Sequence, residues 1–316
     1  MLKKIKNKLV QGTESICMAG LVPIEKILLE RLKNPTSPVV FIIGAPRSGT
    51  SLLYELLVRR YNFSYISNLA QKFNETPVAA TKLGIKFIKK WHPQSNNSYN
   101  SNYGNINGWG APSEGGMIWN RWFPESHYLD ETSIENFNSK LVQKTIYGLA
   151  AAMNGPFINK NVMHSVHIRL LNLLFPDCLF IHITRDIQSN VRSILRAHAK
   201  FSIHKNEWFS VKPREYEKYK NEDIILRSVI QVHYIHQNIH EDAELVGENR
   251  FYTVTYEDVC QNSETAIDAI NVYLNKNGVE VRKRDTALPK LSLSSTNKFD
   301  ARTEQKIQYY LQNINQ

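Results

Sequence analysis

The fold is decided by residues 38–61, which read PVVFIIGAPRSGTSLLYELLVRRY. The run from Val39 to Ile43 is rich in β-branched and aromatic residues and lacks polar alternation, which is typical of a strand buried on both faces of a parallel sheet. A turn rich in Gly and Pro follows, and then an apolar segment with helical spacing. The order strand, loop, helix predicts the first unit of an α/β domain.

Strand and helix patterns alternate along the rest of the chain. Short strands are predicted in PFINK, CLFIHIT and FYTVTYEDV, and helices over 134–153, 164–175, 187–198, 223–245 and 265–278. This alternation predicts a P-loop-like, three-layer α/β/α fold with a central, mostly parallel sheet. Residues 94–116 are rich in Asn, Ser and Gly and predict a long loop of the kind that acts as a lid or binding loop.

The N-terminal residues have a different pattern from the rest. Residues 1–34 read as helical until Asn34 and Pro35 stop the pattern, so we expect an N-terminal helical segment over 1–36 and one domain over 37–316. The basic stretch MLKKIKNKLVQ admits two interpretations: a solvated amphipathic helix, or a weak association with a membrane surface. No apolar run reaches the roughly 20 residues that a membrane-spanning helix needs.

The net charge and the cysteines limit which partners and which cellular compartment are expected. The formal net charge of +10 favours acidic ligands such as nucleotides, nucleic acid or anionic glycans. No basic run with interleaved aromatic residues and no nucleic-acid motif is present, so no nucleic-acid partner is expected. Cys17, Cys178 and Cys260 are scattered, odd in number and without metal-ligand spacing. We therefore expect reduced thiols in a cytoplasmic protein; the oligomeric state stays open.

The segment GAPRSGTS, Gly44 to Ser51, lies in the register of the phosphate-binding loop G-x-x-x-x-G-K-[ST]. Ser51 occupies the Ser/Thr position, Thr50 stands where the lysine belongs, and Arg47 supplies a cation earlier in the loop. Backbone N–H groups and the helix dipole still favour an oxyanion here. The missing lysine weakens the alternative of a nucleotide-dependent kinase, for which Asp186 is the nearest candidate metal ligand.

These motifs resemble those of sulfotransferases that use 3'-phosphoadenosine 5'-phosphosulfate. PRSGTS after a buried strand is similar to the family's 5'-phosphosulfate loop, which implies donor contacts from five consecutive residues: Arg47, Ser48, Gly49, Thr50 and Ser51. Arg185 at the end of FIHITR, with Ser193 eight residues later, resembles the pair that contacts the donor's 3'-phosphate. VTYEDV resembles the family's segment with a tyrosine near the adenine, which corresponds to Tyr256.

The resemblance also implies the reaction. The donor is 3'-phosphoadenosine 5'-phosphosulfate, the nucleotide product is adenosine 3',5'-bisphosphate, and no metal is required because cationic side chains serve instead. The bacterial carbohydrate-type members are most similar, so the acceptor is expected to be a hydroxyl of a glycan or of another small molecule. A non-enzymatic module that binds anions or nucleic acid is the alternative outside enzymes.

Catalytic groups are predicted at three positions. Arg47 and Lys160 are expected to neutralise charge on the leaving oxygen; Lys160, in FINKN, resembles an Asn-Lys pair of tyrosylprotein-type and bacterial sulfotransferases. Glu114, in APSEGGMIWNRWF, is the first candidate for the general base. Some family members place a glutamate near the position of Asn68 in this chain. Three further residues remain alternatives for the base: Glu75, His164 and His167.

Aromatic residues gather in or beside the predicted loops. They form either a platform for an acceptor or a small core under long loops. The set comprises Trp109, Trp119, Trp122, Phe123 and Trp208.

Overall fold

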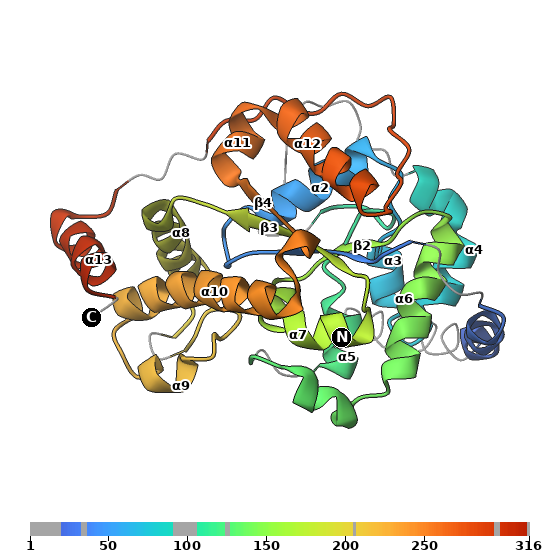
Figure 1. Ribbon diagram of the computed structural model, residues 1–316, viewed down its shortest axis with the longest axis horizontal. Helices are drawn as coiled ribbons and strands as arrows, with labels where there is room; N and C mark the ends of the chain where they lie inside the picture. The colour runs from blue at the N-terminus through green and yellow to red at the C-terminus, as the bar shows by residue number, and fades with distance from the viewer. Residues whose placement is uncertain are drawn as a thin grey trace, which may run out of the picture.

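A four-stranded parallel sheet forms the centre of the protein (Figure 1). The computed structural model describes residues 20–32, 37–90, 106–123, 127–204, 207–293 and 298–314. The strands lie in the order β2-β1-β3-β4, and every neighbouring pair is parallel. Their bounds are β1 Val40–Ile43, β2 Ile158–Lys160, β3 Leu179–Thr184 and β4 Phe251–Thr255. The predicted α/β class with a mostly parallel sheet is confirmed.

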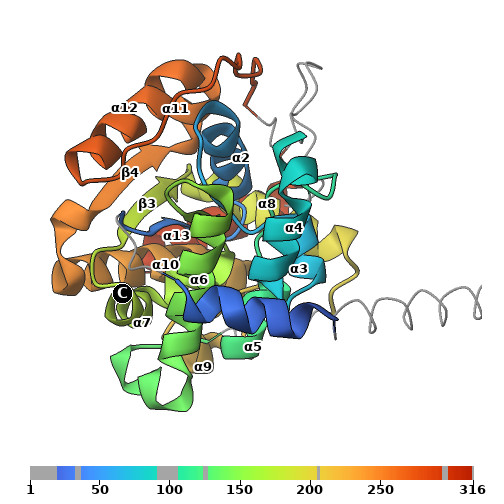
Figure 2. The same cartoon turned by 90° about the vertical axis from the view of Figure 1, so that its right-hand side faces the viewer.

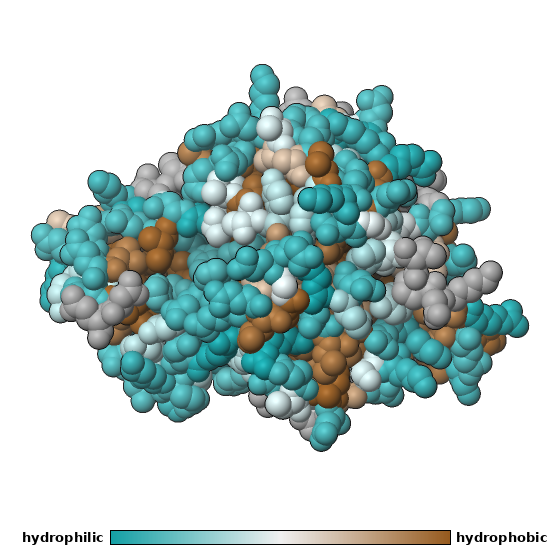
Figure 3. Space-filling model, viewed as in Figure 1, coloured by the Kyte–Doolittle hydropathy of each residue, from teal (hydrophilic) through white to brown (hydrophobic). Residues whose placement is uncertain are grey.

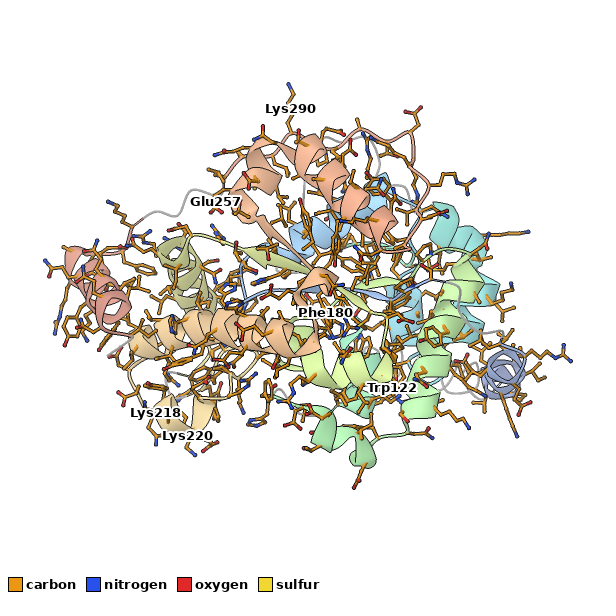
Figure 4. All side chains as sticks on the ribbon, in the orientation of Figure 1. Trp122, Phe180, Lys218, Lys220, Glu257 and Lys290 are labelled. Atoms are coloured by element: carbon orange, nitrogen blue, oxygen red, sulfur yellow. The ribbon has the colours of Figure 1, made fainter. Side chains whose placement is uncertain are left out.

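Helices cover both faces of this sheet, which makes three layers. Val40, Ile42 and Ile181 point to one face and pack with α2 (Thr50–Arg60), α11 (Tyr256–Gln261) and α12 (Ser263–Lys276). Phe41, Ile43 and Phe180 point to the other face. There they pack with α5 (Gly116–Trp122), α6 (Ser139–Met153), α7 (Ile168–Leu174), α8 (Ile187–Lys200) and α10 (Ile224–Val246). Figure 4 places Phe180 at the centre of the molecule. Burial on both faces explains the unbroken apolar run of β1.

Shorter elements complete the chain. These are α3 (Asn68–Lys72), α4 (Pro77–Lys90), α9 (Tyr216–Tyr219), α13 (Ala301–Asn313) and the 3-10 helices η1 (Glu131–Asn136), η2 (Val162–Val166) and η3 (Glu248–Arg250). Residues 20–30 form a further helix, which lies across α6 in Figure 2. Its Glu25 carboxylate accepts hydrogen bonds from the backbone N–H groups of Val78 (3.2 Å) and Ala79 (2.6 Å) and so holds the start of α4.

The predicted N-terminal helix agrees with residues 20–30, but residues 1–19 and 33–36 lie outside the described part of the chain. The same holds for Cys17 and for residues 91–105 of the predicted loop, whereas its residues 106–115 have no helix or strand. The division at residue 36 stays a prediction. Cys178 and Cys260 are buried free thiols. Within the described ranges no helix is both long and apolar enough to cross a membrane.

Two predicted helix starts were wrong. The helix predicted over 134–153 begins at Ser139, since Asn138 Oδ1 accepts from the N–H of Leu141. The helix predicted from residue 164 begins at Ile168 and is preceded by η2. The segment FYTVTYEDV, predicted as a strand with a turn, forms β4 up to Thr255, whose Oγ1 caps α11.

Two half-buried histidines form a pair between β3 and α10. The rings of His182 and His236 lie with Nε2 and Nδ1 2.9 Å apart. Burial is the main cause that lowers the pKa of His182 to about 3 and that of His236 to about 4. Both imidazoles are therefore still neutral in the folded protein at pH values at which the same two histidines of the unfolded chain already bind protons.

We expect this pair to make the protein less stable in acid. In the folded protein both pKa values lie below the ordinary histidine value of 6.5. The two histidines therefore make their full contribution to the free energy of unfolding above about pH 6.5, and this contribution is lost as the pH falls towards 4. Denaturant titrations from about pH 7 to about pH 5 should show a falling free energy of unfolding, with a smaller slope in His236→Gln. His204→Gln is the control, because His204 is exposed and does not contribute to the pKa shift of either histidine. Equal slopes in all three proteins would contradict the assignment.

Candidate functional site

The carboxyl ends of the four strands meet at one edge of the sheet. The register pairs Ile42 with Lys160, Ile43 with His182, and Thr184 with Thr255. The segments that continue from these residues therefore emerge side by side, and ligands of open α/β sheets bind at this edge. They carry the 44–51 loop, Lys160, Arg185 and Tyr256.

The loop between β1 and α2 is built to receive an anion. Gly49 is the N-cap of α2 in the left-handed conformation (φ 104°), and Arg47 is also left-handed (φ 69°). In the described part of the chain, no side chain caps the first turn of α2 and no acidic residue lies in it. The buried Ser48 hydroxyl has no hydrogen-bond partner among the described residues. Open N–H groups and a dipole then favour negative charge at this helix end.

Ser165 holds the start of this loop. Its Oγ accepts from the backbone N–H of Gly44 (2.9 Å) and donates to the carbonyl of the same residue (2.9 Å). Ser165 is fully buried in η2, 121 residues further along the chain. The sequence does not single out Ser165, because nothing local distinguishes it from any other serine in a helical pattern.

The three motifs that the sequence singles out come together at the edge. The Arg185 guanidinium donates to the carbonyl of Arg47 (3.2 Å) and lies 4.4 Å from the centre of the Tyr256 ring. Nε of Arg47 donates to Oγ of Ser193 on α8 (3.4 Å). The two arginines are thus neighbours, because β1 and β3 are adjacent strands. Of the other loop residues, Thr50 is buried and Ser51 is partly exposed at the start of α2.

The residue that a kinase would need for its metal is engaged elsewhere. Asp186 Oδ1 accepts from the backbone N–H of Ser189 (2.8 Å) and caps α8. The backbone N–H of Asp186 donates to Glu257, which Figure 4 labels at the start of α11. Together with Thr50 in the lysine position, this arrangement argues against the kinase alternative.

Lys160 and Glu114 form an ion pair at the end of β2. The Lys160 side chain is 6% exposed, whereas Glu114 is 33% exposed and reaches solvent. Asn161 Nδ2 donates to the carbonyl of Glu114 (3.3 Å) and steadies the backbone of the same residue. The sequence identified both charged residues as candidates, but their contact across 46 positions depends on the fold.

A buried polar network supports this pair from below. The amide of Asn159 accepts from Trp119 Nε1 (2.8 Å), lies 2.8 Å from His164 Nε2, and donates to the carbonyl of Ser113 (3.3 Å). The Tyr54 hydroxyl also donates to Ser113 (3.4 Å), and burial raises its pKa well above the ordinary value. Ser113 precedes Glu114, so these bonds fix the backbone that carries the carboxylate. Tyr54 was missed because the sequence shows it as one more apolar helix position.

The alternative bases are either buried or at a separate cavity. Burial lowers the pKa of His164 well below its ordinary value and that of His167 to about 4. The ring of His167 bonds the carbonyl of His127 (3.0 Å). Glu75 lines a separate cavity of about 420 Å³ beside the 20–30 helix. Asn68 Nδ2 donates to the carbonyls of residues 106 and 108 and holds that loop.

The aromatic residues divide between core and surface. Trp119 is 1% exposed, and Trp122 and Phe123 join it in the core beside the sheet, where Figure 4 labels Trp122. Trp208 is partly buried and donates to the carbonyl of Val211 (2.9 Å). Trp109, at 60% exposed, stays on the surface beside the Glu114 segment. For the three residues around α5 the core interpretation is correct.

Comparisons with known proteins indicate the family. Residues 38–277 match a family model described as the sulfotransferase family. "Omega-hydroxy-beta-dihydromenaquinone-9 sulfotransferase Stf3" from Mycobacterium bovis and from Mycobacterium tuberculosis is 26% identical over 251 residues. That alignment covers 72% of this chain and 60% of the relative, so the chain spans about 60% of the length of these curated proteins.

A solved structure supports the fold. The sulfotransferase STF9 from Mycobacterium avium superposes with a TM-score of 0.51 over 95% of this chain and 73% of that one. Its sequence identity is 15%, so this likeness concerns the fold alone.

We expect Gly49→Ala to disable the anion loop. A Cβ at this position would lie 2.5 Å from Cδ2 of Tyr256, and the left-handed conformation costs a residue with a side chain about 1–2 kcal/mol. The variant should bind adenosine 3',5'-bisphosphate at least roughly tenfold more weakly in calorimetric titration. Gly20→Ala is the control, since that Cβ meets nothing within 4 Å. Unchanged affinity in Gly49→Ala would show that the loop does not hold the nucleotide.

Proposed function

The chain belongs to the sulfotransferase family, and we propose that it transfers a sulfuryl group from 3'-phosphoadenosine 5'-phosphosulfate to a hydroxyl group of its acceptor. The observation that carries the proposal is the convergence of Arg47, Arg185, Ser193 and Tyr256 through direct contacts. These residues come from three separate strand ends. Two guanidinium groups, a hydroxyl and an aromatic ring suit a ligand with two phosphates and a purine.

The donor would use each group for a distinct purpose. The open N–H groups of α2 and the buried Ser48 hydroxyl fit the 5'-phosphosulfate. Arg185 and Ser193 are proposed to hold the 3'-phosphate, and Tyr256 to lie near the adenine. These cations supply the positive charge that a metal supplies in many phosphoryl transfers, so the proposed reaction uses no metal.

The ion pair at the end of β2 is proposed as the catalytic pair. Glu114 accepts the proton of the acceptor hydroxyl, and the hydroxyl oxygen of the acceptor bonds to the sulfur. The bond from sulfur to the bridging phosphate oxygen breaks, and Lys160 neutralises the charge that develops on that oxygen. Exposure of Glu114 and burial of Lys160 support this division, because the acceptor arrives from solvent while the leaving oxygen belongs to a bound nucleotide.

Two classes of acceptor deserve a direct comparison. The sequence favours a carbohydrate hydroxyl. The curated relatives are named for an ω-hydroxy menaquinone derivative, and Trp109 and Met117, which flank Glu114 in the chain, are 60% and 53% exposed. Such apolar exposure favours an alcohol with an apolar body. A screen with labelled donor against glycans and against long-chain alcohols separates the two.

Nucleotide discrimination tests the donor assignment. The parent protein should bind adenosine 3',5'-bisphosphate at least roughly tenfold more tightly than adenosine 5'-phosphate in calorimetric titration. The ratio should shrink in Arg185→Ala, which removes a bidentate cation, and less in Ser193→Ala. Equal affinity of the parent for both nucleotides would remove the main support for this donor.

The base assignment is tested by Glu114→Gln. Loss of a general base typically lowers kcat by about 10²–10⁴-fold, while the affinity for the nucleotide should stay close to that of the parent. Glu131→Gln serves as the control, since Glu131 also pairs with a cation, Arg169, but lies in η1. If Glu114→Gln turns over normally and His167→Asn is inactive, the histidine is the base.

A further inference from the structure

The C-terminal helix α13 lies beyond the residues that match the family model, which end at 277. It packs against α8 and α10 at the edge of the molecule (Figure 1), and apolar side chains gather on this face around α8 and α13 (Figure 3). Ile307 is fully buried in the core below the sheet. The Tyr310 hydroxyl donates to Asp223, the N-cap of α10 (2.5 Å). The helix is therefore an integral part of the fold.

One carboxylate of α13 grips α8. Glu304 accepts from Nε of Arg192 with both oxygens (3.0 and 3.1 Å) and from Nη2 of Arg192 (2.6 Å). The side chains are 15% and 9% exposed. The backbone N–H of Phe299 donates to the same carboxylate (2.8 Å). These bonds hold the pKa of Glu304 below its ordinary value, with Arg192 the first cause. A charged, nearly buried fork of this kind fixes geometry more strictly than an exposed ion pair.

The ion pair between Glu304 and Arg192 lies on a face of α8 next to the proposed donor site. Gln188, Arg192 and Arg196 are spaced four residues apart and share one stripe of the helix. Gln188 accepts from Nη2 of Arg192, and the Arg196 guanidinium lies 5.1 Å from the centre of the Phe299 ring. Ser193 follows Arg192 and is turned about 100° around the helix, where it meets Arg47. Any rotation of α8 about its axis moves both residues together.

We propose that Glu304 is a positioning residue for the 3'-phosphate subsite, acting through Arg192 to fix the rotation of α8 and hence the direction of the Ser193 hydroxyl; this rests on the proposed function. The buried side chains of α8, among them Val191 and Ile194, hold its inner flank, whereas α13 holds the outer one. Contacts on both sides of α8 are needed to fix its rotation, because Ser193, the proposed phosphate contact, lies between the two sides.

The test compares two contacts of the same helix. In Glu304→Gln the bond between α13 and α8 is weakened, and in Tyr310→Phe only the bond between α13 and α10 is lost. Calorimetric titrations with adenosine 3',5'-bisphosphate and adenosine 5'-phosphate give the ratio of affinities for each protein. We expect the ratio to fall at least roughly threefold in Glu304→Gln and to stay at the parent value in Tyr310→Phe, although both variants lower Tm.

A second variant guards against loss of folding. Arg192→Lys keeps the charge but lacks the planar fork, so it should lower the ratio in the same direction and by less. An unchanged ratio in folded Glu304→Gln and Arg192→Lys, or an equal fall in Tyr310→Phe, overturns the positioning role and leaves α13 a purely structural helix. If the parent itself does not discriminate between the nucleotides, the donor assignment fails first. The two failures are therefore distinct.

Discussion

The parallel register of β1 with its two neighbours is the constraint on which the rest of the structure depends. Strands that run in one direction must release their chains at one edge, so loops from residues 44, 161, 185 and 256 meet there. The register is itself a consequence of burial on both faces, because a slip by one residue would exchange the two apolar sets of the sheet. Core packing thus brings the segments of the site to one edge, and further contacts orient their side chains.

Cationic side chains gather at this edge of the sheet. Arg47 and Arg185 lie together without a carboxylate in the first turn of α2, while Lys160, deeper in the protein, is compensated by Glu114. An anion that lies beside both guanidinium groups is attracted by two positive charges at once. The Glu114 carboxylate offsets part of the cost of burying the Lys160 side chain, since an isolated buried charge would be costly.

Buried polar contacts fix what hydrophobic packing leaves adjustable. Ser165 on Gly44 and Asn159 on Ser113 are bonds made away from water, and a buried group left without its partner costs about 1–3 kcal/mol. Such penalties restrict the 44–51 loop and the segment that carries Glu114 to one arrangement. Glu304 makes a comparable contact with Arg192 of α8, and it comes from a helix that lies outside the residues matched by the family model.

The sequence by itself determined the α/β class, the order of strands and helices, and the residue types of the site, because these depend on local patterns such as the run from Val39 to Ile43 and the glycines after it. Helix starts were less predictable, since a cap such as Asn138 competes with the pattern. Only the tertiary structure decided that Lys160 meets Glu114, that His164 is enclosed, and that Arg192 is bound by Glu304. These contacts join residues far apart in the chain, so they exist only once the strand register and the helix packing have set the distances between them.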